Sequence, residues 1–227
     1  MRTDYAGHDR AYQRKRKDPA YAGWIKHDEL NEDWQLSWQL LIQKNAFLKQ
    51  GHLLELGCGA GNISLQLAKQ GYEVVGIDIA PTAIDWAIEN AAQADIEATF
   101  LVGNVLTLAE IEDASFDIAL DGRCFHCIIG SDRWQFLQSA HRVLKANGIL
   151  AINTMCDQVP DTPHFQERFD PQSRCVMRDG IATRYIGESN SILQEIIQAG
   201  FKLLDVEVYP PKHQEDLADL HVIAKRI

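Results

Sequence analysis

Apolar positions along the chain follow two different periods after about residue 50. Short runs rich in β-favouring residues alternate with stretches whose apolar positions recur every three or four residues. The runs that predict strands are HLLEL (52–56), EVVGID (73–78), ATFLVG (98–103), FDIAL (116–120) and GILAINT (148–154). Strands that alternate with helices predict an α/β fold, with a mostly parallel sheet covered by helices on both faces.

Residues that favour the start or the end of a helix set the bounds of the helices predicted between these strands. The first predicted helix begins at Asn62 and stops at Gly71, because glycine favours the end of a helix. The second begins at Pro81, since proline is preferred at the first helical position. The third covers about 132–145 and ends before an Asn-Gly pair.

The C-terminal part of the chain changes the pattern. A predicted helix at about 189–199 is followed by two β-like runs, 201–210 and 219–227, which a short polar loop joins. Two such runs predict an antiparallel hairpin at the edge of the sheet. The complete sheet is therefore predicted to have seven strands.

Two segments lie outside this alternation. Residues 1–50 are predicted to form a helical N-terminal cap on a domain of residues 51–227. Trp34, Trp38, Leu41 and Leu48 could share one helical face in that cap.

The second segment is an insertion at 155–187. It is longer than most connections in compact domains, which predicts a lid. Within it, RCVMRDGIATRY predicts a hairpin because Asp179 and Gly180 suit a type I′ turn.

Three glycines alternate directly after the first predicted strand, in LELGCGAGN (54–62). A turn that binds a dinucleotide has the spacing G-x-G-x-x-G, and Asn62 stands where that pattern has its third glycine. Glu55 lies near the carboxyl end of the strand, two residues before the first glycine, where its carboxylate would repel a pyrophosphate and attract a cation. The turn therefore disfavours NAD, and with it a nucleotide-dependent oxidoreductase.

Several motifs occur in a fixed order: ELGCGAG, GIDIAP, GNV, FDIALDGRCFHCI and RVLKANGILAINT. Over roughly residues 50–155 this order resembles that of the class I S-adenosylmethionine (SAM)-dependent methyltransferases. The resemblance implies a Rossmann-like sheet with a reversed last strand. It also implies SAM as the cofactor and a methyl transfer that releases S-adenosylhomocysteine (SAH).

The resemblance implies roles for individual residues along this order. The glycines would let the backbone approach the methionyl part of SAM, Glu55 would complement its amino group and sulfonium, and Asp78 would accept both ribose hydroxyls. Each role also has a structural alternative. The glycines could simply form a tight turn between strand and helix, and Asp78 could cap the helix that follows. The predicted cofactor-binding residues are Glu55, Gly57, Cys58, Gly59, Gly61, Asp78, Ile79 and Asn104 with Val105, the last three beside the adenine, and Asp121 near the methyl donor.

His126, in the loop after the fourth strand, is the candidate catalytic base because its ordinary pKa lies near neutrality. A methyltransferase mainly aligns the acceptor and excludes water, so a base is optional, and a hydrogen-bonded structural role for His126 remains open. Cys124 and Cys127 form a CxxC that could gather with His126, Cys156 and Cys175 around a soft metal or metalloid. Cysteines also act as small buried apolar residues, and no metal is assigned.

The charge composition limits the classes of molecule that the chain is expected to bind. The chain has 22 basic and 32 acidic residues, a net charge of −10, which disfavours nucleic acid and anionic membranes. The basic run 14–17 is the local exception, read as a solvated segment or an anion contact. No apolar run reaches the roughly 18 residues of a membrane helix, and five unevenly spaced cysteines predict reduced thiols and a cytoplasmic location.

The acceptor is expected to be a small molecule bounded by the N-terminal segment and the insertion. An alternative is a SAM- or SAH-binding module that regulates a partner without catalysis, and protein or RNA methylation remains open. The candidate wall residues are the aromatic Tyr5, Tyr12, Trp24, Trp34, Phe165, Phe169 and Tyr185 and the basic Arg168, Arg174, Arg178 and Arg184.

Overall fold

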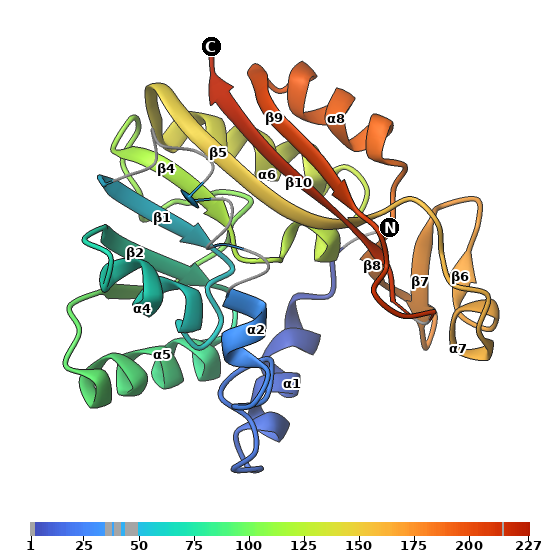
Figure 1. The fold of residues 1–227 in the computed structure, drawn as a ribbon, viewed down its shortest axis with the longest axis horizontal. Coiled ribbons are helices and arrows are strands. Elements are labelled where there is room, and N and C mark those ends of the chain that lie inside the picture. The colour runs from blue at the N-terminus through green and yellow to red at the C-terminus, as the bar shows by residue number, and fades with distance from the viewer. Residues whose placement is uncertain (1–2, 35–37, 39–41, 44–49, 215) are drawn as a thin grey trace.

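The computed structural model describes residues 3–34, 38, 42–43, 50–214 and 216–227, and its elements are labelled in Figure 1. The helices are α1 (Tyr5–Lys15), α2 (Leu30–Trp34), α4 (Asn62–Ala68), α5 (Pro81–Ala94), η2 (Phe125–Cys127), α6 (Asp132–Val143), α7 (Pro163–Gln166) and α8 (Ser189–Gln198). The strands are β1 (His52–Leu56), β2 (Glu73–Asp78), β3 (Thr99–Val102), β4 (Phe116–Asp121), β5 (Leu144–Cys156), β6 (Phe169–Asp170), β7 (Cys175–Arg178), β8 (Ile181–Tyr185), β9 (Phe201–Tyr209) and β10 (Ala218–Arg226).

The larger sheet has seven strands in the order β3-β2-β1-β4-β5-β10-β9. Its first five strands run parallel, whereas β10 pairs antiparallel with both β5 and β9. This confirms the predicted Rossmann-like, mostly parallel sheet with a C-terminal antiparallel hairpin. The strand order reverses direction between β1 and β4, and open α/β sheets bind ligands at the carboxyl ends of the strands beside such a point.

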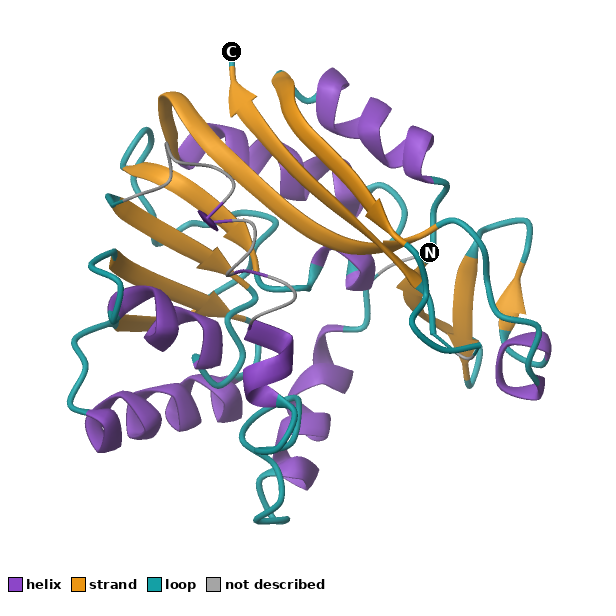
Figure 2. Ribbon diagram, viewed as in Figure 1, coloured by secondary structure: helices purple, strands orange, loops and turns teal. Residues whose placement is uncertain are grey.

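Helices cover both faces of this sheet (Figure 2). Leu54 and Leu56 of β1 pack in the same buried cluster as α6 and α8, while Leu53 joins the opposite cluster with α4. Successive side chains of a strand point to opposite faces, so a run of apolar residues buries both sides. A third cluster packs α5 against α4 and β3.

Two predicted boundaries differ from the structure near β5. The predicted helix 132–145 ends at Val143, and β5 begins at Leu144 rather than at Gly148. Leu144 pairs with Phe116, whereas the next residue paired with β4 is Ile149, which pairs with Ile118. The chain bulges between these pairs through Asn147, whose positive φ of 65° is one that asparagine tolerates.

The helical prediction for the N-terminal segment is correct for α1 and α2 and wrong for residues 16–29. Those residues form turns that one β-bridge closes between Tyr21 and Lys26. Of the predicted helical face, Trp34 and Trp38 are buried together against Leu53 of β1, while Leu41 and Leu48 lie outside the described residues.

The insertion contains α7 and a separate three-stranded antiparallel sheet, β6-β7-β8. The predicted hairpin is confirmed: β7 and β8 flank Asp179 and Gly180, whose φ values are 51° and 76°. Two consecutive positive φ angles are what a type I′ turn requires. No helix in the described part of the chain is long and apolar enough to cross a membrane.

Candidate active site

A cavity of about 860 Å³ opens at the carboxyl ends of the parallel strands. Its wall combines the glycine turn after β1, the ends of β2 and β4, the N-terminal segment, the insertion and the β9–β10 hairpin. The predicted site residues on this wall are Glu55, Gly57, Cys58, Gly59, Asp78, Ile79, Asn104, Val105 and His126. Gly61 and Asp121, the other two predicted residues, do not line it.

The glycine turn leaves no space for side chains. Gly57 and Gly59 have positive φ angles of 76° and 55°. A Cβ added to Gly57 would lie 2.5 Å from the Cβ of Cys124, and one added to Gly59 would lie 2.3 Å from the phenol oxygen of Tyr12. Glycine is therefore required at both positions by conformation and by packing.

Gly61 has a different role from the other two glycines. It precedes α4 with a φ of 75°, and a Cβ there would lie 2.8 Å from the ring of Phe100. This position allows α4 to pack closely on its neighbours, away from the cavity wall.

Asp78 ends β2 and joins the turn to the following helix. The backbone N–H groups of Gly59 and Ala80 each donate to its carboxylate at 2.9 Å. Ala80, not Asp78, is the N-cap residue of α5, so the alternative of Asp78 as a helix cap is wrong. Burial raises the pKa of Asp78 above its usual value, and these hydrogen bonds offset only part of that rise. The turn thus holds a nearly buried carboxyl group against the cavity.

Glu55 is almost fully buried, and the hydroxyl of Ser64 donates to it. Burial raises its pKa to about 8, and the nearby carboxylates of Asp78 and Asp121 act in the same direction. Glu55 is therefore mostly protonated at neutral pH in the free protein. A cation placed beside it would favour the charged form.

Three smaller groups continue the same wall. Ile79 is half-buried and Val105 is buried. The side-chain oxygen of Asn104 accepts a hydrogen bond from the backbone N–H of Leu106 at 2.9 Å, which fixes the turn after β3. Together they offer apolar surface and an orientated amide.

Asp121 lies behind the wall rather than on it. One carboxylate oxygen accepts from the backbone N–H groups of Cys124 at 2.8 Å and Phe125 at 3.0 Å. The other oxygen has no hydrogen-bond partner within the described residues, and burial raises the pKa of Asp121 to about 6. Its visible effect is to fix the loop that carries His126.

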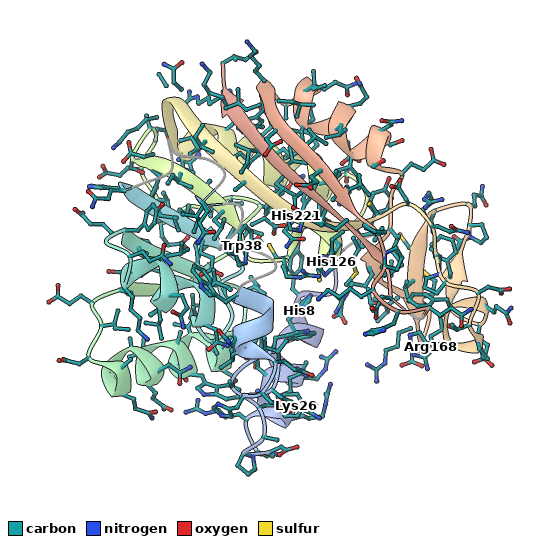
Figure 3. The ribbon with its side chains drawn as sticks, in the orientation of Figure 1. His8, Lys26, Trp38, His126, Arg168 and His221 are labelled. Atoms are coloured by element: carbon teal, nitrogen blue, oxygen red, sulfur yellow. The ribbon has the colours of Figure 1, made fainter. Side chains whose placement is uncertain are left out.

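His126 lines the cavity with only 5% of its surface exposed. Burial and the cations of Arg184 and Arg123 hold its pKa well below the ordinary value, so the imidazole is neutral at pH 7. Its Nδ1 atom has no hydrogen-bond partner in the part of the chain that the structure describes. Figure 3 labels His126 with His8 of α1 and His221 of β10, and all three line this cavity.

The cysteines do not form a cluster around one ion. Cys58, Cys124 and Cys127 line the cavity, but Cys156 and Cys175 do not. All five are free thiols whose pKa burial raises. Across the described ranges, no three His, Cys, Asp or Glu side chains are grouped so that they could hold a metal ion.

The prediction of which residues form the acceptor-binding wall is only partly correct. Tyr5, Tyr12, Trp24, Phe165 and Arg184 line the cavity, whereas Trp34, Phe169, Tyr185, Arg168, Arg174 and Arg178 do not. Arg123 also lines the wall, in the loop after the fourth strand that was expected beside the methyl donor. Sequence patterns missed other wall residues, chiefly His8, Trp38, Tyr209, Asp219 and His221. These residues reach the wall from segments that only the folded chain brings together.

The strand order, the glycine turn against the end of β2 and the acidic residues beside it define a nucleotide-binding α/β domain of the methyltransferase type. The chain belongs to the methyltransferase domain family, whose model matches residues 48–200.

Two curated relatives show how far this similarity extends. The chain is 32% identical over 108 residues to a ubiquinone biosynthesis O-methyltransferase of Azorhizobium caulinodans. That alignment covers 48% of this chain and 42% of the relative. The chain is 31% identical over 88 residues to a ribosomal RNA small subunit methyltransferase C of Alcanivorax borkumensis. That alignment covers 39% of this chain and 27% of the relative. The chain thus spans less than half the length of either relative.

A solved structure matches nearly the whole fold. The 1,6-didemethyltoxoflavin-N1-methyltransferase of Burkholderia thailandensis, with 1,6-didemethyltoxoflavin and SAH bound, superimposes with a TM-score of 0.67. The match covers 98% of this chain and 85% of that one at 17% identity, so it shows a shared fold.

Proposed function

We propose that the chain is a cytoplasmic SAM-dependent methyltransferase that acts on a small molecule and releases SAH. The observation that carries this proposal is the cavity itself. It joins the glycine turn and the end of β2 to a second wall built from segments outside the common sheet. A volume of about 860 Å³ falls within the usual range for small-molecule sites.

The residues on the β1–β2 side fit SAM. Glycines at 57 and 59 keep the turn free of side chains, and the carboxylate of Asp78 retains acceptor capacity beyond its two backbone hydrogen bonds. Glu55 and Asp78 place acidic groups where the cofactor's cationic groups and ribose would be held. SAM would supply an electrophilic methyl group on a sulfonium that is a good leaving group.

The chain's own residues would orient the acceptor and exclude water. His126 presents a neutral imidazole, held in place by the loop that Asp121 fixes, and it could accept a proton from an acceptor that must lose one. The insertion 155–187, through Phe165 and Arg184, would act as a lid together with the N-terminal segment as a cap.

Calorimetric titration of the purified chain with SAM, SAH and NAD tests the cofactor. The expected result is saturable binding of SAM and SAH and no binding of NAD. Binding of NAD alone would overturn the proposal.

A second experiment tests catalysis. SAM with a radiolabelled methyl group is incubated with the chain and either a deproteinised small-metabolite extract or ribosomal RNA. Label transferred to small molecules supports the proposal, while label in RNA alone would contradict the small-molecule acceptor. Tight SAM binding with no transfer to either would favour the regulatory module instead.

A further inference from the structure

The cavity wall is electrically asymmetric. Carboxyl groups gather at the glycine turn, at Glu55 and Asp78, where the proposed function places the cationic cofactor. Basic side chains gather on another part of the wall, where His8, His126 and Arg184 all face the same cavity.

Packing around Arg133 brings two of these basic residues together. The Arg133 guanidinium lies 3.9 Å from the ring of Phe125 and 4.4 Å from the ring of Tyr185. It therefore ties η2 to β8. The chain neighbours of these two aromatic residues are His126 and Arg184, so both reach the same wall.

Trp24 brings in the third residue. Its ring lies 6.1 Å from the ring of His8 and 5.8 Å from the guanidinium of Arg184. The N-terminal segment and the insertion thus meet across the cavity at one half-exposed indole.

Arg184 has hydrogen-bonding capacity to spare. Its one hydrogen bond among the described residues is donated to the neighbouring carbonyl of Thr183 at 2.8 Å, and no carboxylate there pairs with it. A guanidinium has five N–H donors in a planar fork that matches a carboxylate. The fork is half-buried and remains largely unsatisfied.

Other acids on the wall do not neutralise this group. Asp219 is paired with Arg123 at 3.2 Å. Glu29 and Asp216 accept backbone N–H groups of Lys26 and His213. The guanidinium groups of Arg184, Arg123 and Arg133 all lower the pKa of His126.

We propose that Arg184, with His8 and His126 beside it, forms an anion subsite that binds a carboxylate group carried by the methyl acceptor. This inference rests on the proposed function, because it assigns the acidic side of the cavity to SAM and the basic side to the acceptor. Arg184 is then a residue that determines acceptor specificity. The aromatic rings of Tyr5, Trp24 and Phe165 offer surface for the apolar body of such an acid.

Carboxylates paired with their neutral isosteres test the subsite. Acetate, benzoate and 3-phenylpropanoate are titrated into the full chain beside their primary amides, with and without saturating SAH, and binding is followed by ligand-observed NMR. At least one carboxylate is expected to bind about tenfold or more tightly than its amide. Arg184→Gln should abolish that preference, leaving amide binding and the calorimetric SAH affinity unchanged.

Two further variants make the test specific. Arg178→Gln changes an exposed arginine on the adjacent strand β7, away from the cavity, and should preserve the preference. Arg184→Lys keeps the charge and should retain part of it, which also checks that loss in Arg184→Gln is not a folding defect.

The other possible results of these titrations contradict either the anion subsite or the proposed function. Equal binding of every acid and amide, or no acid binding, overturns the subsite. Loss of SAH affinity in Arg184→Gln with the acid preference intact means that Arg184 holds the cofactor's own carboxylate. If wild type does not bind SAH, the proposed function fails, while the titrations without SAH still decide whether the wall selects carboxylates.

Discussion

Asp78 uses only part of its acceptor capacity in the free protein. Each of its two oxygens accepts one backbone N–H, from Gly59 and from Ala80, and an ionised carboxylate has about four lone-pair sites. Charge-assisted hydrogen bonds to a ribose would therefore need no rearrangement of the turn. We predict that Asp78→Ala weakens SAM binding by roughly 1–3 kcal/mol, measured by calorimetry.

Asp85 provides the matched control. It is exposed on α5, the helix that follows Asp78, and Asp85→Ala should leave SAM affinity unchanged. Because Asp78 also holds the turn, the unfolding transition of each variant is measured alongside. A well-folded Asp78→Ala that binds SAM as wild type does would show that the ribose is placed elsewhere.

Glu55 should make the stability of the free protein depend on pH. Its pKa rises from 4.5 to about 8 on folding, so folding favours the protonated carboxyl. The associated stability is fully present below pH 4.5 and is lost progressively as the pH rises through 8. Glu55→Gln cannot titrate but keeps an oxygen that can accept from Ser64.

The expected result is a difference between two curves. Urea unfolding of wild type and Glu55→Gln is compared across this pH range, and the variant should gain stability relative to wild type as the pH rises. Contributions from other titrating groups are common to both proteins and cancel. Parallel curves would mean that Glu55 is ionised in the folded protein at neutral pH.

The site residues that the sequence predicted share one property: each lies in a strand or just after it. Glu55, Asp78 and Asn104 are placed at one edge simply because parallel strands end there. The same rule does not place His8, which lies on α1, or His221, which lies in β10, because β10 runs antiparallel to those strands. The sequence also did not predict which way each residue faces. Gly61 and Asp121 were therefore expected on the cavity wall, although they lie behind it.

At the scale of elements, Arg133 joins α6 to three neighbours. Only 4% of its surface is exposed, and it pairs with Glu195 of α8 at 2.7 Å. It also donates to the carbonyl of Phe125 at 2.9 Å and stacks against Tyr185 of β8. Its removal would leave buried acceptors unsatisfied.

We predict that Arg133→Gln lowers the free energy of unfolding by about 2–4 kcal/mol, measured by urea denaturation. Glu195→Gln should cost less, because that carboxylate is half-exposed. Arg10→Gln, at an exposed arginine 4.0 Å from Asp4, is the control and should have little effect. A loss in Arg133→Gln no larger than that of the control would contradict this account.

Elements with strong local signals were predicted closely. Strands β1 and β2 have the predicted bounds, and the β7–β8 hairpin forms at its Asp-Gly turn. Errors arose where tertiary pairing decides the conformation. β5 extends beyond its predicted start because Leu144 finds a partner in Phe116, and residues 16–29 lack the apolar periodicity that would stabilise a helix.

At the scale of the whole molecule, segments from both ends of the chain close one cavity. The N-terminal segment is tied to the rest by polar contacts and by buried side chains, with Tyr12 packed on α5 and Trp38 on the large sheet. Examples are Thr82 N–H donating to Asp9 and Asn62 donating to the carbonyl of Ala22, both at 3.0 Å. Arg16 of the basic run pairs with Glu89 of α5, so that run is partly engaged with the domain.

Both α1 and β7–β8 lie outside the seven-stranded sheet, which predicts where a ligand would add most protection. Peripheral segments open at lower free energy than the central strands, so a ligand that bridges them to the sheet should suppress that opening. We predict that SAH slows backbone hydrogen exchange in α1 and in β7–β8 as well as in the glycine turn, measured by mass spectrometry. NAD at the same concentration is the control and should leave exchange unchanged. Protection confined to the glycine turn and the end of β2 would show that SAH binds without drawing the N-terminal segment and the insertion together, and closure would then require the acceptor.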